Sequence, residues 1–453
     1  MAHLFALSEE NRTFLARIAR LALPIIIQDL MVHAALVLTS ILIGGLGDSA
    51  ITAVGVASRI TFLFVNMCFG INTTAAALIG QFWGKGDIKN IHKAMGIAIM
   101  VGLIAATIFV SIIMFFAFDI MMFFTQGNAE VAVLGVAYLR LASWGYFAIA
   151  LCQMLRFASQ GIGQPKISVY SMGTMLITNT VLCFLFIRVM GHGVEGAGLA
   201  FLISRIVEAI AVVLATIMFK LPLVTKIRNY FAFDRCILKE YFKLGAPVMA
   251  NEAIWSSGTA LYTYVFAFTG PSGQAASQIV LVISDFFLVF GIAVSAGCGV
   301  LIANALGADK ISYARRLSNK CMVVATVVTV VAALLMIALA LPILSLYTIS
   351  PEVHRLAFEM LLVAAAFAVP RVLTFAIFIS VLRNGGDTLF CLLVDFLAVW
   401  CFALPLAWFF ASTFGLSATV VTAIIFSEEI FKLVIVYKRM RGGKWARNLV
   451  KHV

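Results

Sequence analysis

The sequence predicts an all-α polytopic membrane protein with twelve transmembrane helices in two pseudo-symmetric six-helix lobes. Three observations support this fold class. Long apolar runs recur along the chain, Lys and Arg gather on one side of those runs, and landmark residues repeat at a constant offset.

The apolar runs give the number of spans. Of the 453 residues, 63% are hydrophobic and only 11% are charged, so much of the apolar surface must face lipid. Twelve runs of roughly 20 or more residues can be drawn, and each can cross a hydrocarbon core of about 30 Å. Because the runs are continuous, they predict helices and not the alternating strands of a membrane barrel. The predicted spans are 21–44, 50–82, 94–118, 131–158, 167–189, 194–219, 244–268, 275–305, 320–346, 355–382, 388–411 and 417–437.

The positions of Lys and Arg orient these spans. One side has 25 of the 32 basic residues, at the N-terminus, in the loops after the second, fourth, eighth and tenth spans, in the central linker and in the tail. The other side has only Arg188 and Arg355. This asymmetry predicts that both termini are cytoplasmic, and it supports the count of twelve. The first twenty residues lack the apolar core of a signal peptide, so we expect a multi-pass protein of the cell inner (plasma) membrane.

A constant offset in residue number relates the two halves. It places Pro24 on Pro247, Gly47 on Gly270, Gly84 on Gly307, Thr125 on Thr348 and Gly163 on Gly386. We therefore divide the chain into an N-lobe (1–219), a cytoplasmic linker (220–243) and a C-lobe (244–453) that includes a basic tail. In transporters built from two such repeats, a binding site lies between them near the bilayer midplane.

The same offset pairs two polar dipeptides. It places Gln28 and Asp29 on Asn251 and Glu252. Each half thus has an amide and a carboxylate side by side, about 12 Å inside the predicted cytoplasmic end of its first helix, at 1.5 Å per residue.

Several segments resemble the multidrug and toxic compound extrusion (MATE) family. They are PIIIQDLMVHAALVLTSILIGGLGDSAITAVGVA and GINTTAAALIGQFWGKGDIKNIHKA in the first half, GCGVLIANALGADKISYARR in the second, and the turns QGIGQPK and VLRNGGDT. The resemblance covers nearly the whole chain. It implies two six-helix lobes in a V shape, which export organic cations and other amphipathic compounds against sodium or proton entry.

The chain departs from a cation site that the resemblance implies for the N-lobe. Asn179 is present, but Thr39 and Cys183 stand at the acidic positions and Phe201 stands at a threonine position. Phe and Cys supply no oxygen ligands for a sodium ion. We therefore do not expect an N-lobe sodium site of the usual form.

Carboxylates within the spans are the candidates for ion coupling, because a charged group in the bilayer costs at least ~2.5 kcal/mol. Glu252 is the strongest candidate: it resembles the helix 7 glutamate of the family, and a partly buried Glu can exchange a proton. Its neighbour Asn251 belongs to the same candidate site. Asp395 and Asp285 could complete a C-lobe cluster with Glu252. A salt bridge to Arg371 is the structural alternative for each acid, and this arginine could equally bind anionic substrate groups.

In the N-lobe, Asp29 lies at the depth of Glu252 and is followed one turn later by His33. The two side chains could pass a proton, whereas the alternative is a hydrogen bond that only stabilises the helix. Two further sets have the spacing of ion pairs within a helix, and we interpret them as mainly structural. They are Arg205 with Glu208, and Glu428 and Glu429 with Lys432.

These features predict a secondary active antiporter that exports cationic or amphipathic small molecules (multidrug efflux) and is coupled to H⁺ or Na⁺ entry by alternating access. The alternative is a lipid-linked saccharide flippase of the same superfamily, which would prefer a strongly cationic cavity. No HExxH, GxSxG or P-loop pattern occurs, so we expect no enzyme activity, no catalytic residues and no metal site. We expect no cofactor apart from the coupling ion. The expected partners are small organic cations or amphipathic compounds, the coupling ion and the lipid bilayer, with no nucleic acid and a monomeric chain.

Overall fold

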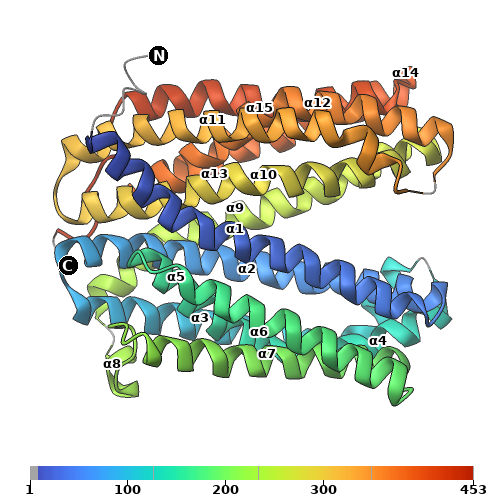
Figure 1. Ribbon diagram of the computed structural model, residues 1–453, viewed down its shortest axis with the longest axis horizontal. Coiled ribbons are helices and arrows are strands. Elements are labelled where there is room, and N and C mark those ends of the chain that lie inside the picture. The colour runs from blue at the N-terminus through green and yellow to red at the C-terminus, as the bar shows by residue number, and fades with distance from the viewer. Residues whose placement is uncertain (1–8, 126, 233, 348, 452–453) are drawn as a thin grey trace. The chain divides into compact units, whose positions relative to one another are not determined.

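The described part of the chain is mostly helical and contains no β-strand (Figure 1). The computed structural model describes residues 9–125, 127–232, 234–347 and 349–451, apart from the side chains of residues 9, 10, 36, 37, 40 and 48. One landmark of the repeat, Thr348, lies outside these residues.

The described helices line up as twelve rods once short interruptions are bridged. The first six are α1 (Glu9–Gly44), α2 (Asp48–Lys85), α3 (Ile88–Phe124), α4 (Ala129–Ser143) with α5 (Gly145–Gly161), α6 (Lys166–Cys183) with the π-helix η2 (Phe184–Val189), and α7 (Gly193–Met218). The short helix α8 (Ile227–Tyr230) follows. The second six are α9 (Arg235–Ala267), α10 (Gly270–Gly307), α11 (Ile311–Leu344), α12 (Pro351–Phe375) with η3 (Ala376–Arg383), α13 (Thr388–Phe396) with η4 (Leu397–Ala403) and α14 (Leu404–Phe414), and α15 (Ala418–Arg441). The predicted spans fall on these rods in order, and the all-α polytopic fold class is confirmed.

Most rods are apolar enough to cross a membrane. Among the described residues, eight helices meet this condition by length and composition, and the pair α4–α5, bent by 48°, makes a ninth. The other three rods are α1, α9 and α15. Some side chains of α1 are not described, and both α9 and α15 have polar residues in the middle of their predicted spans. Those polar residues belong to the candidate site.

The chain forms two compact units. The N-unit comprises Ile27–Tyr241, and the C-unit comprises Met1–Ile26 together with Phe242–Val453. The first boundary lies inside α1, so the beginning of this helix belongs with the second half of the sequence. Ile18 and Ala22 of α1 are accordingly buried in the apolar core of the C-unit.

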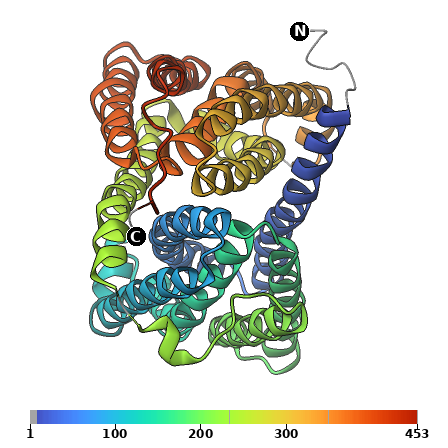
Figure 2. The ribbon, with the colours of Figure 1, turned by 90° about the vertical axis from the view of Figure 1, so that its left-hand side faces the viewer.

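Each unit is held together by helix packing around a core of small and aliphatic side chains. In the C-unit, α10 packs against α11 and α12, and α12 also packs against α15. In the N-unit, α2 packs against α3, α4 and α5, while α7 packs against α4, α5 and α6. Figure 2 shows many of these helices end-on.

Two pairs of repeated glycines have the same unusual backbone conformation. Gly47 and Gly270 have φ of +100° and +82°, and Gly163 and Gly386 have φ of +77° and +85°. Side chains rarely allow positive φ, so glycine is favoured where the chain turns between helices in this way. The repeat offset therefore preserves turn geometry as well as residue type.

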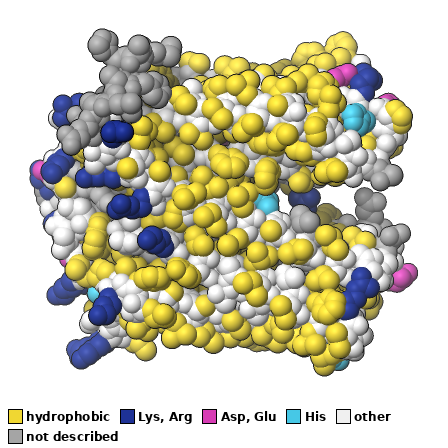
Figure 3. Space-filling model, in the orientation of Figure 1, with side chains coloured by type: hydrophobic (Ala, Val, Ile, Leu, Met, Phe, Trp, Pro, Cys, Tyr) yellow, Lys and Arg dark blue, Asp and Glu magenta, His cyan; other side chains and the backbone are white. Residues whose placement is uncertain are grey.

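The surface suits a lipid environment. Figure 3 shows hydrophobic side chains over the middle of the visible face. Large apolar side chains remain exposed on it and elsewhere, such as Phe115 at 80% and Leu346 at 82%. In each unit, Lys and Arg gather towards one end, where α1 begins in the C-unit and where α8 lies in the N-unit. Apolar flanks with basic ends are the pattern expected of membrane-spanning helices.

Candidate functional site

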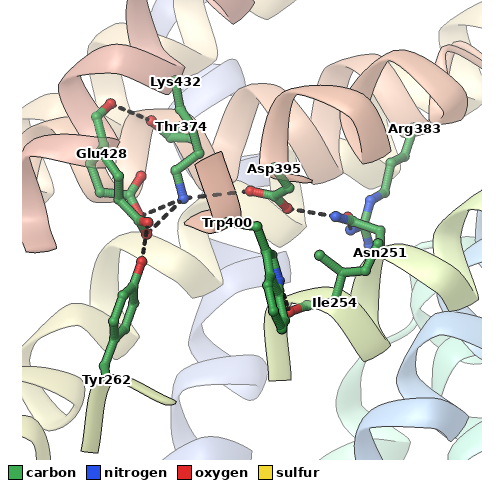
Figure 4. A network of polar contacts seen from close by, with 10 residues as sticks. Asn251, Ile254, Tyr262, Thr374, Arg383, Asp395, Trp400, Glu428 and Lys432 are labelled. Carbon is green, nitrogen blue, oxygen red and sulfur yellow. Dashed lines mark hydrogen bonds and ion pairs between the residues drawn. The ribbon is translucent and has the colours of Figure 1, made fainter. Parts of the chain in front are cut away.

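The candidate site is a buried polar network in the C-unit (Figure 4). Four helical segments contribute to it: α9, the end of η3, α13 and α15. Two residues of the network are associated with π-helices. Arg383 is the last residue of η3, and Asp395 comes two residues before η4 begins. Such turns are frequent at functional sites.

Asn251 connects the first part of the network. Its amide nitrogen donates to Oδ2 of Asp395 at 2.7 Å, and its amide oxygen accepts from Nη2 of Arg383. Nη1 of Arg383 also forms an ion pair with Oε1 of Glu252 at 2.8 Å. Asn251, Glu252, Arg383 and Asp395 are all buried. One arginine thus holds both members of the predicted amide–carboxylate pair.

Lys432 connects the second part. Its Nζ lies 3.0 Å from Oε1 of Glu429, 3.2 Å from Oε1 of Glu428 and 3.5 Å from Oδ1 of Asp395. The hydroxyl of Tyr262 donates to the other oxygen of Glu428. Since the two oxygens of Asp395 contact Asn251 and Lys432, the network is continuous from Glu252 to Glu428.

The network has more acids than bases. Four buried carboxyl groups, on Glu252, Asp395, Glu428 and Glu429, are matched by two buried cations, on Arg383 and Lys432. With every group ionised, the net charge is −2. Isolated negative charge is costly in a low-dielectric interior, so bound protons or cations would stabilise this cluster.

One carboxyl oxygen of the network lacks a partner. Oε2 of Glu429 is buried and has no hydrogen-bond partner among the described residues. The backbone carbonyl of Glu429 accepts from the hydroxyl of Thr374 at 3.2 Å, which fixes this turn of α15 against α12. Lys432 thus holds one oxygen of this carboxyl group, while the other oxygen is buried without a hydrogen bond among the described residues.

Close packing orients α9 against η4. The indole nitrogen of Trp400 donates to the backbone oxygen of Ile254 at 3.2 Å. Beside it, a Cβ atom added to Gly258 would lie 2.3 Å from Cγ1 of Val399. Glycine is thus required at this close approach, less than two turns from Glu252.

The structure brings together three of the predicted C-lobe residues and separates two. Asn251, Glu252 and Asp395 share the network, whereas Asp285 forms a separate ion pair with Arg371 at 3.1 Å. These two side chains are partly exposed, at 48% and 28%. The expected cluster of Asp285 with the other two acids is therefore not present, and the salt-bridge alternative holds for Asp285.

Other members of the network were not predicted as functional residues. Arg383 was assigned to the loop after the tenth span, but it is buried at the end of η3. Glu428, Glu429 and Lys432 do form the predicted ion pairs within α15, and these pairs also reach Asp395. Three ionisable residues within one predicted span are a sequence signal that could have identified them.

The N-unit has a counterpart of the Arg383 cluster in which a glutamine replaces the arginine. Gln28 donates to Oδ1 of Asp29 at 3.1 Å and accepts from Gln160 at 3.3 Å. The offset that pairs Gln28 with Asn251 also pairs Gln160 with Arg383, so the repeat places a glutamine where the C-unit has the arginine. The described residues include no hydrogen bond between Asp29 and His33, which leaves the predicted proton relay without a direct contact.

Asn179 lies in a second polar cluster of the N-unit. Its amide donates to Thr39 at 2.9 Å, and its oxygen accepts from Ser204 at 3.5 Å and from Cys183 at 3.9 Å. None of these partners is a carboxylate. Farther along α7, Glu208 pairs with Arg205 at 2.8 Å, as the helix spacing predicted.

The two polar dipeptides thus lie in repeated frameworks, and comparisons with known proteins identify these frameworks. A family model described as MatE matches residues 24–185 and 247–409. The chain belongs to the MatE family. The two matches begin at Pro24 and Pro247, which are the first pair of landmarks in the sequence repeat, and the family resemblance is confirmed. The chain is therefore a multi-pass membrane transporter.

Individual MatE relatives are distant but cover most of the chain. "Uncharacterized transporter YisQ" of Bacillus subtilis is 23% identical over 88% of each chain. "Probable multidrug resistance protein NorM" of Bradyrhizobium diazoefficiens is 24% identical over 88% of this chain and 87% of its own. The structure titled "Crystal structure of MATE in complex with MaL6" has a TM-score of 0.85 at 18% identity and covers 94% of this chain and 96% of its own.

Proposed function

We propose that this MatE transporter is a secondary active antiporter that exports cationic or amphipathic small molecules in exchange for H⁺ or Na⁺. The observation that carries the proposal is the excess of two carboxyl groups in the buried network of the C-unit. Relatives named as probable multidrug resistance proteins support the direction and the substrate class.

The charge excess gives a physical basis for exchange. A proton or Na⁺ that binds to the carboxylates lowers the negative charge that could attract an organic cation. A bound organic cation likewise lowers the negative charge that could attract the proton or Na⁺. Ion and substrate then compete for the same charge, even without touching the same atom. This competition is the condition for antiport, because the transporter changes access with one of the two bound.

We further propose that the second half does the coupling. In the C-unit, Glu252 and Asp395 contact groups on three different helical segments, so a change in their charge alters the contacts between α9, η3 and α15. In the N-unit, the cluster around Asn179 has no carboxylate among its described partners. A sodium ion prefers several oxygen ligands, which the C-unit can supply from carboxylates and from the Asn251 amide.

The flippase alternative has less support. A lipid-linked saccharide would be held by cations that are free to bind phosphate. Arg383 and Lys432 are instead paired with carboxylates at 2.8 Å and 3.0 Å. The fold itself does not decide the matter. A solved structure of a Pyrococcus furiosus transporter, which has a TM-score of 0.83 to this chain, is described with the words "Reverse polarity of binding pocket suggests different function".

Dye efflux from everted membrane vesicles tests the proposal. Export of a cationic dye is measured under a proton gradient alone and under a sodium gradient alone. We expect one gradient to drive export by the wild type and Glu252→Gln to abolish that dependence. Glu359→Gln is the matched control, because Glu359 forms an exposed ion pair with Arg355.

Two results would count against these claims. Undiminished gradient-driven export by Glu252→Gln would remove the coupling role of this residue. Failure of both gradients to support export of any tested cation by the wild type would reject the antiporter itself.

A further inference from the structure

A small basic pocket lies at one end of the C-unit, outside the network. Its lining includes Arg315, Ser318 and Asn319 of α11, Arg441 at the end of α15, and Gly443 and Trp445 of the tail. Its volume is about 200 Å³. Sites for drug-sized ligands enclose roughly 300–1,000 Å³, so this pocket suits a smaller chemical group.

The tail that closes the pocket is firmly docked. Trp445 is fully buried, and its indole nitrogen donates to the backbone oxygen of Met440 at 2.9 Å. Nη2 of Arg315 donates to the backbone oxygen of Gly443 at 2.9 Å. A Cβ at Gly385 would lie 2.0 Å from the backbone oxygen of Trp445, so the tail also lies directly against the turn before α13. The pocket walls are therefore built by ordered parts of the chain.

The pocket has positive charge without a matching acid. No lining residue is Asp or Glu. Within the described part of the chain, neither Arg315 nor Arg441 forms an ion pair. The neighbouring Arg439 differs, because Asp387 holds it through two contacts at 2.6 Å and 3.0 Å. The nearby acid is thus already occupied, and the two pocket arginines keep donors for an external anion.

The pocket lies beside the ends of two predicted membrane spans, where lipid headgroups are expected. Its residues at 315–319 directly precede the predicted span 320–346, and those at 441–445 follow the predicted span 417–437. Basic pockets at this level are suited to the phosphates of anionic lipids. Guanidinium groups bind phosphate oxygens through paired, charge-assisted hydrogen bonds, and Asn319 adds an uncharged polar group.

We propose that this pocket binds a phosphate group, carried either by an anionic phospholipid headgroup or by a free phosphate ion. The bound phosphate bridges α11 and α15 through Arg315 and Arg441 and thereby secures the docked tail. The site is separate from the ion-coupling network and does not depend on the transported substrate.

Thermal unfolding of the purified full chain in a neutral detergent tests the proposal. The shift in melting temperature is titrated with a short-chain phosphatidylglycerol, with the matching phosphatidylcholine and with inorganic phosphate. The main variant is Arg441→Gln, because this side chain makes no hydrogen bond or ion pair within the described residues. Arg316→Gln is the matched control: Arg316 is exposed nearby on α11 and does not line the pocket.

We expect Arg441→Gln to raise the half-saturating ligand concentration about tenfold, as for the loss of a hydrogen bond to a charged group, and Arg316→Gln to leave it unchanged. Arg315→Lys is a second variant that keeps the charge, and we expect it to bind more weakly because lysine lacks the planar fork. Saturable stabilisation by phosphatidylglycerol alone identifies a lipid headgroup, whereas equal stabilisation by inorganic phosphate identifies the free ion. Absence of saturable stabilisation by both ligands, or an equal response of Arg441→Gln and wild type, overturns the proposal.

Discussion

Replacing Lys432 by methionine tests whether the C-unit network depends on its buried cation. Lys432 is only 3% exposed and lies within 3.5 Å of three carboxyl groups. Methionine keeps the length and the apolar stem of the side chain but removes the charge. The network is then left with four carboxyl groups and one cation, Arg383.

The expected loss of stability is large. Removal of one partner from a buried ion pair typically costs about 3–5 kcal/mol, because the remaining charge stays buried without compensation. We therefore expect Lys432→Met to lower the free energy of unfolding by about 3–5 kcal/mol. Adding Glu429→Gln removes one of the uncompensated acids, so we expect the double variant to recover part of this loss, about 0.5–3 kcal/mol.

Unfolding by SDS in mixed micelles, followed by tryptophan fluorescence, measures these differences. Lys451→Met is the matched control, because Lys451 pairs with Asp309 at 3.8 Å and both side chains are more than half exposed. Exposed pairs contribute at most about 1 kcal/mol. The electrostatic account of the network would be wrong if the free energy of unfolding of Lys432→Met lay within about 1 kcal/mol of the wild-type value. It would also be wrong if adding Glu429→Gln lowered the free energy of unfolding further instead of restoring part of it.

Two further predictions concern the tail and the linker. Trp445 is fully buried, so Trp445→Ala should undock the tail at a cost of about 3–5 kcal/mol and speed tryptic cleavage after Lys444, while Trp408→Ala, at a half-exposed position, should not. The backbone N–H of Cys236, and then Lys93, hold the pKa of Asp234 below its usual value of 3.8. The hydrogen bonds that the ionised carboxylate makes should therefore keep the linker ordered above about pH 4, and this order should be lost as the pH falls through the lowered pKa. Hydrogen exchange of linker peptides, corrected for intrinsic rates, measures this loss; protection that does not change with pH, or that matches Asp234→Asn throughout, would contradict it.

The sequence was sufficient for the fold because the membrane restricts the possible structures. Each apolar run has to satisfy its backbone hydrogen bonds internally, so length and hydropathy predict a helix wherever such a run occurs. The glycine pairs at 47 and 270 and at 163 and 386 mark turns with positive φ, which explains why they survive the repeat. The cytoplasmic position of the termini stays a prediction.

The site was harder to predict because burial depends on where a rod ends. The tenth span was drawn to residue 382, which placed Arg383 in a loop on the basic side. The π-helix η3 instead carries the rod through Arg383, and the carboxyl group of Glu252 and the amide of Asn251 hold its guanidinium. Similarly, helix spacing correctly paired Lys432 with Glu428 and Glu429, but it could not show that Asp395, on another rod, completes the cluster.

The repeat explains why the two halves can share a framework and still differ in charge. Its constant offset relates Gln28 to Asn251, Asp29 to Glu252 and Gln160 to Arg383. In the N-unit, the resulting contacts join two amides and one carboxyl group, and no cation forms an ion pair with Asp29 among the described residues. In the C-unit, Arg383 pairs with Glu252, and further acids on α13 and α15 are buried around a second cation, Lys432. The exchange of glutamine for arginine at the repeated position is thus one of the differences between the two halves that accompany the dense acidic network of the C-unit. The reverse exchange, Arg383→Gln, would leave the buried network of the C-unit with four acids and one cation, a burial that the membrane interior disfavours.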